Sequence, residues 1–125
     1  MDNAPIRIFI GYDSREVVAW HVLAHSIVRN ASRPVHDLCA VNEDLDESLA
    51  AMSALDEYVG VSSTNVHLRA GTGRTGRILV PFPPEWRWMA AGDSAWFPGF
   101  TVYRQDVASG WDAALGRLRA DLPPS

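Results

Sequence analysis

A run of polar side chains directly follows a short apolar segment near the middle of the chain. Residues 58–61 (Tyr-Val-Gly-Val) have the composition of a buried strand, and residues 62–65 (Ser-Ser-Thr-Asn) come next. If this polar run begins a helix, unpaired backbone N–H groups and the positive end of the helix dipole lie beside its hydroxyl and amide groups. The pattern suits the binding of a phosphate. The alternative interpretation is that the hydroxyl groups only cap the helix.

Tyr12 and Asp13 follow another apolar run, Ile6 to Ile10, in the same way. At the carboxyl end of a strand, an aromatic ring and a carboxylate can hold the base and a ribose hydroxyl of a nucleoside. Asp13 together with Glu16 also fits a capping box for the helix that follows. The sequence leaves both roles of Asp13 open.

The motifs that could hold a metal or a pyrophosphate are weaker. Asp44-Leu45-Asp46 has the letters of the Asp-x-Asp metal motif, but it stands at the start of an acidic helix, where capping is favoured. Gly71-Thr72-Gly73 lacks the third glycine of a dinucleotide fingerprint and follows a helix instead of a strand. We therefore predict no cofactor and no metal ligands. A divalent cation is possible, but only the Asp-x-Asp sequence suggests one.

Residues 81–100 form a long segment rich in proline, glycine and tryptophan. Its aromatic side chains could stack on a base or a sugar ring, or they could form a lid over the core; they are Trp86, Trp88, Trp96 and Phe97. Arg87 and Arg104 could pair a phosphate or brace the segment. A third interpretation is an interface for self-association or for a partner protein.

The elements that would position these residues alternate between strand and helix. Strands are expected over residues 6–10, 58–62 and 78–80, and residues 35–41 and 101–103 can form further strands. Helices are expected over residues 13–30, 44–55, 64–68 and 111–122. This alternation is typical of a parallel α/β sheet. We expect one α/β domain over residues 1–125, a Rossmann-like half domain with about four mainly parallel strands and helices on both faces.

Composition limits the classes of function. The chain has 125 residues and a formal net charge of −4, which argues against a nucleic acid as partner. Cys39 is the single cysteine, so an internal disulfide is excluded. The sequence predicts no membrane span and no signal peptide, and the cytoplasm is the expected location.

Residues 6–34 resemble the beginning of bacterial glycosyltransferases of the GT-A type, through the run that starts Ile-Arg-Ile-Phe-Ile-Gly-Tyr-Asp. The resemblance implies that Tyr12 and Asp13 lie near the nucleotide. A complete enzyme of that type continues to a metal-binding Asp-x-Asp on a later strand, and this chain changes its resemblance near Pro34 before it reaches one.

Residues 35–122 are similar to the C-terminal part of heptosyltransferase-like glycosyltransferases of the GT-B type, which are often found behind tetratricopeptide repeats. The motifs are residues 35–46, residues 58–69, Pro84-Glu-Trp-Arg-Trp-Met and Trp96-Phe-Pro-Gly-Phe-Thr-Val-Tyr-Arg-Gln, in the same order. The resemblance implies that Ser63, Thr64, Asn65 and His67 face the diphosphate of a nucleotide sugar.

Both resemblances are partial, because the acceptor domain and the catalytic base of a complete GT-B enzyme have no counterpart in this sequence. The expected function is therefore a glycosyltransferase-related domain that binds a nucleotide diphosphate sugar, with a truncated organisation and a fusion point near Pro34. No catalytic residue is assigned. The alternative is a catalytically inactive glycosyltransferase remnant that acts as a binding or protein-interaction module.

Overall fold

The computed structural model describes residues 17–31, 41 and 43–123. These residues belong to two compact units, one that ends at Tyr58 and one that begins at Val59. The strand expected over residues 6–10 and nearly all of the strand expected over 35–41 fall outside the described residues, as do Tyr12 and Asp13. The expected single domain over residues 1–125 stays a prediction.

The first unit contributes two helices, α1 (Val17–Asn30) and α2 (Leu45–Ala54), which confirm the helices that the apolar spacing predicts. Asp44 begins α2, because its carboxylate accepts hydrogen bonds from the backbone N–H groups of Asp46 and Glu47 at 2.8 and 3.0 Å. The capping role favoured for Asp44 is therefore confirmed.

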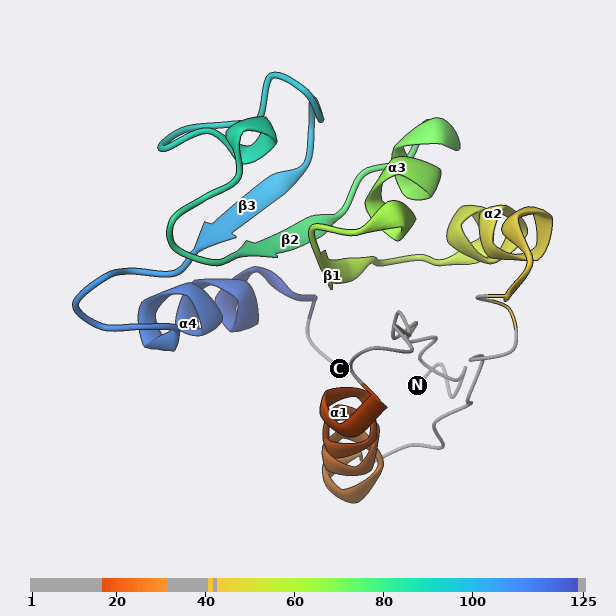
Figure 1. The fold of residues 1–125 in the computed structure, drawn as a ribbon, viewed down its shortest axis with the longest axis horizontal. Helices are drawn as coiled ribbons and strands as arrows, with labels where there is room; N and C mark the ends of the chain where they lie inside the picture. The colour runs from red at the N-terminus through yellow and green to blue at the C-terminus, as the bar shows by residue number, and fades with distance from the viewer. Residues whose placement is uncertain (1–16, 32–40, 42, 124–125) are drawn as a thin grey trace. The chain divides into compact units, whose positions relative to one another are not determined.

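The second unit contains a parallel sheet in the order β1-β2-β3 (Figure 1). The strands are β1 (Val59–Val61), β2 (Arg77–Val80) and β3 (Thr101–Arg104). Helix α3 (Thr64–Gly71) connects β1 to β2, the 3-10 helix η2 (Trp86–Trp88) lies between β2 and β3, and α4 (Asp112–Asp121) follows β3. The α/β fold class is confirmed. Three strands are present among the described residues, where the sequence predicts about four.

Alternation along the strands assigns the two faces of the sheet. Leu79 and its register partner Tyr103 face α4, where Tyr103 forms a buried cluster with Ala114 and Leu118. The pair one step further, Val80 and Arg104, consequently faces the opposite side. Figure 1 shows α4 on one side of the sheet, and α3 and the segment around η2 on the other.

A three-way hydrogen-bond network ties the α4 face together. The Tyr103 hydroxyl donates to the Asp121 carboxylate at the end of α4 (2.9 Å) and accepts from Arg77 Nη1 on β2 (3.1 Å). Burial, followed by the hydrogen bond to Asp121, raises the pKa of Tyr103 above its ordinary value. The neutral phenol is therefore the form that the fold stabilises.

The connection from β2 to β3 is unusual for a parallel pair, because residues 81–100 make the crossover without an α-helix. Parallel strands need a connection that returns along one face of the sheet, and a helix usually provides it. Here the segment covers the sheet with its own buried rings, and we call it the crossover loop. Its buried side chains are Trp88, Ser94, Phe97 and Phe100.

Among the residues that the structure describes, no helix is both long and apolar enough to cross a membrane.

Candidate functional site

The polar turn predicted from the sequence lies between the carboxyl end of β1 and the first turn of α3. Ser63 precedes the helix with extended backbone (φ −159°, ψ 174°), and Thr64 is its first residue. In the part of the chain that the structure describes, the Ser63 side chain makes no capping hydrogen bond. Capping therefore does not use the Ser63 hydroxyl, which is left exposed beside the helix N-terminus.

The four predicted diphosphate ligands of this turn do not lie in equivalent environments. Ser63, Thr64 and His67 are exposed, so a ligand in solution can reach them. Asn65 is only 6% exposed, and it belongs to the interior of the unit. The structure thus brings three of the predicted groups to the surface on one helical turn, and the direct role of Asn65 in binding stays a prediction.

Two side-chain contacts join this turn to the crossover loop. The Ser62 hydroxyl donates to the Glu85 carboxylate at 3.0 Å, although the two residues are 23 positions apart. The His67 ring lies edge-on to Phe97, with 5.1 Å between the ring centroids. The crossover loop therefore contacts the turn through Ser62 and helix α3 through His67, and sequence patterns contain no signal for either contact.

Arg104 on β3 holds the crossover loop from within. Its Nε donates to the Met89 carbonyl at 3.2 Å, and its Nη2 donates to the carbonyls of Gly92 (2.8 Å) and Trp88. Burial, with a smaller contribution from Arg117, lowers the pKa of Arg104. Of the two roles that the sequence leaves open for Arg104, the structure shows the brace.

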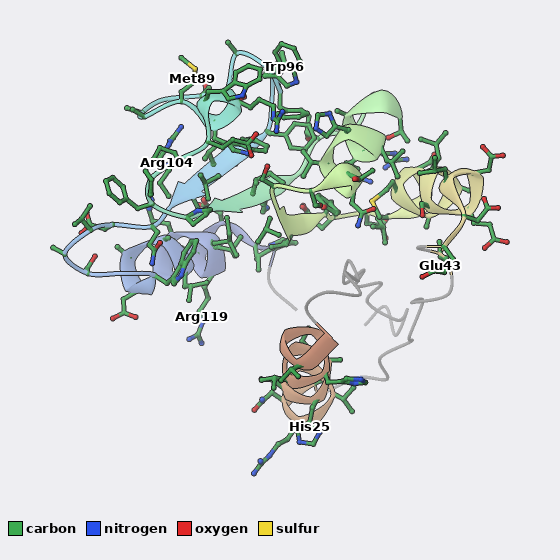
Figure 2. The ribbon with its side chains drawn as sticks, viewed as in Figure 1. His25, Glu43, Met89, Trp96, Arg104 and Arg119 are labelled. Carbon is green, nitrogen blue, oxygen red and sulfur yellow. The ribbon has the colours of Figure 1, made fainter. Side chains whose placement is uncertain are left out.

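The aromatic residues of the crossover loop divide into a buried set and an exposed set. Trp88 and Phe97 are stacked at 4.8 Å and are 1% and 3% exposed, so they form the predicted lid. Trp86 and Trp96 lie edge to face at 5.2 Å, yet they are 65% and 57% exposed. Figure 2 shows Trp96 at the outer side of the loop. Both predicted roles, lid and accessible aromatic surface, are therefore available to this segment.

Arg87 is half-buried and contacts one of the two exposed tryptophans. Its guanidinium carbon is 5.2 Å from the centroid of the Trp86 ring, and it forms an ion pair with Glu85. The negative charge of Glu85 beside the turn is thereby compensated by a neighbouring cation.

The weaker motifs do not join this site. Gly71-Thr72-Gly73 lies at the C-terminal end of α3, where carbonyl groups and the negative end of the dipole disfavour a pyrophosphate. Within the described ranges, no group of three or more His, Cys, Asp or Glu side chains is arranged to hold a metal ion.

Comparison with known proteins gives one partial match among curated sequences. A segment of 44 residues is 43% identical to the Protein CDI of Arabidopsis thaliana. This segment covers 35% of the chain and 17% of that relative. No protein-family profile matches the chain, and no solved structure matches it.

Proposed function

We propose that this chain binds a nucleotide diphosphate sugar, with the diphosphate at the turn between β1 and α3. The observation that carries the proposal is the exposure of Ser63, Thr64 and His67 together at the N-terminus of α3, at the carboxyl edge of a parallel sheet. Ligands of open α/β sheets bind at that edge, and a helix N-terminus there favours an anion. The resemblance of residues 35–122 to GT-B glycosyltransferases points to the same residues.

The groups around the turn have the chemistry that a diphosphate requires. Hydroxyl groups and backbone N–H groups donate hydrogen bonds to phosphate oxygens, and each such bond to a charged group contributes about 1.5–3 kcal/mol. The His67 ring is held in place by its edge contact with Phe97, so one of its nitrogens can be directed at an oxygen without a large loss of side-chain freedom. Sugar transfer is not part of the proposal, because no group is assigned as catalytic base.

Calorimetric titration with uridine, adenosine and guanosine diphosphates and their sugar derivatives tests the proposal, with and without magnesium. The informative variants are Thr64→Ala and His67→Phe, since phenylalanine keeps the ring on Phe97 and removes both nitrogens. Each should weaken binding of the diphosphate about tenfold or more, as a lost hydrogen bond to a charged oxygen implies.

Thr101→Ala is the matched control, because Thr101 is exposed and stands at the first position of β3, at the end of the parallel sheet opposite to the turn. The control variant should bind as the parent chain does. Equal affinity of the parent, Thr64→Ala and His67→Phe chains would exclude the turn as the diphosphate site. A chain that binds none of the ligands while giving a cooperative melt would support the inactive remnant instead.

A further inference from the structure

We infer that the exposed pair Trp86 and Trp96 forms the stacking surface for the nucleobase of the same ligand. The inference rests on the proposed function, because it places the base relative to a diphosphate at the turn. The sequence-based expectation places Tyr12 and Asp13 near the nucleoside and leaves stacking on a base or a sugar ring open for four aromatic residues of the crossover loop.

Both tryptophans are one residue away from a side chain that touches the turn. Trp86 follows Glu85, whose carboxylate accepts from Ser62 at 3.0 Å. Trp96 precedes Phe97, whose ring contacts His67 at 5.1 Å. Trp86 and Trp96 are therefore the sequence neighbours of the two residues through which the loop contacts residues 62–67. A base attached through one ribose to the diphosphate is the part of the ligand that would reach them.

The two rings are also preorganised. Their planes make an angle of 75° at a centroid separation of 5.2 Å, and Arg87 lies over the Trp86 ring. Beneath them, Arg104 holds the loop through carbonyl groups, and the Ser94 hydroxyl donates to the Arg87 carbonyl at 2.6 Å and accepts from the Phe97 N–H at 3.1 Å. A loop held in this way gives a ligand stacking surface at little cost in ordering.

The size of the exposed pair favours a base over a second protein chain. With exposures of 65% and 57%, the pair offers roughly 300 Å² if a free tryptophan side chain exposes about 250 Å². A standard protein interface buries about 800 Å² on each partner. Stacking of one base on an aromatic side chain needs far less surface, and alanine substitution of such a side chain costs about 1–3 kcal/mol per base.

The test compares nucleoside diphosphates with inorganic pyrophosphate, which has the phosphates but no base. Trp86→Ala and Trp96→Ala should each weaken binding of uridine, adenosine or guanosine diphosphate by about tenfold, within the range that base stacking implies, and should leave pyrophosphate affinity unchanged. Trp86→Phe should recover part of the loss, because a ring face remains. Met89→Ala is the matched control, since Met89 is a 46% exposed apolar residue of the same loop.

The outcomes separate this inference from the proposed function. If pyrophosphate and nucleotides bind the parent chain and the tryptophan variants bind nucleotides as tightly, the inference is wrong and the diphosphate site stands. If the parent chain binds neither ligand, both are wrong. The solution mass of the parent chain could rise with concentration while that of Trp96→Ala does not. If nucleotide affinity is also unchanged in this variant, the pair is a contact between two copies of the chain, and the inference is overturned.

Discussion

Gly99 is the position where a single methyl group tests the packing of the crossover loop most directly. Its backbone has φ of +83°, a conformation that residues with a side chain rarely adopt, and a Cβ added there would lie 2.9 Å from Thr75 Cγ2. Gly99 leads into Phe100 and β3, so it fixes how the loop returns to the sheet. Gly99→Ala should therefore destabilise the second unit.

Two costs combine in this substitution. A left-handed conformation costs a residue with a side chain roughly 1–2 kcal/mol. The close contact adds about 1 kcal/mol, the low end of the range for an added methyl group, because Gly99 and Thr75 are both exposed and the Thr75 side chain has room to move. We expect a loss of about 2–3 kcal/mol in the free energy of unfolding, which for a unit of this size lowers the melting temperature by about 8–24 °C.

The two costs can be separated with a second substitution. Thr75→Ser removes the methyl group that the new Cβ would meet and keeps the hydroxyl, so the double variant should regain about 1 kcal/mol relative to Gly99→Ala. The assay is urea unfolding followed by tryptophan fluorescence and by circular dichroism. The dependence of the free energy of unfolding on urea concentration is compared between variants.

Gly116→Ala is the matched control, because Gly116 is exposed within α4 and a Cβ there would meet no heavy atom within 4 Å among the described residues. Alanine in a helix should stabilise the chain by about 0.5–1 kcal/mol. The reasoning is refuted if Gly99→Ala is as stable as the parent within about 0.5 kcal/mol, a spread typical of neutral surface substitutions. It is also refuted if Thr75→Ser gives no recovery.

Two further substitutions test the hydrogen bonds that define the elements. Tyr103→Phe removes the hydroxyl shared by Asp121 and Arg77 and should cost about 1–2 kcal/mol near neutral pH. Because the folded-state pKa of Tyr103 is raised above its ordinary value of 10.0, the contribution of the hydroxyl is complete below pH 10 and is lost as pH rises through the folded-state pKa. This reasoning is contradicted if the free energies of unfolding of the parent and of Tyr103→Phe fall by the same amount as the pH rises above 10. Asp44→Ala removes the cap of α2 and should cost about 1 kcal/mol in urea unfolding, whereas Ser53→Ala, at an exposed position of the same helix, should be nearly neutral.

Local sequence patterns determined the secondary structure of the described residues. Apolar spacing predicts α1 and α2, and short β-rich runs predict β1, β2 and β3 within one or two residues of their observed ends. These patterns succeed because a helix or strand must place its apolar residues on one face, and this requirement is visible in a single stretch of sequence. The parallel pairing of β1 with β2 follows from the alternation of strand and helix, whereas the pairing of β2 with β3 does not, because no α-helix joins these two strands.

The position of the polar turn could also be predicted, because a strand that runs into a helix fixes where residues 62–67 lie. Their separate environments could not. Asn65 and Thr64 are neighbours of similar polarity, yet Asn65 is buried and Thr64 is exposed. Successive residues of a helix face directions about 100° apart, and only the packed fold decides which direction is the interior.

The crossover loop is the part that only the tertiary structure decided. From sequence, Trp86, Trp88, Trp96 and Phe97 are equivalent candidates for a lid or for a stacking surface. The fold divides them, because Arg104 and the Ser62–Glu85 hydrogen bond join residues 12 to 23 positions apart and fix which rings face inward. Contacts over such separations leave no local pattern, so the sequence by itself determined the elements and their order, and long-range packing determined which side chains a ligand can reach.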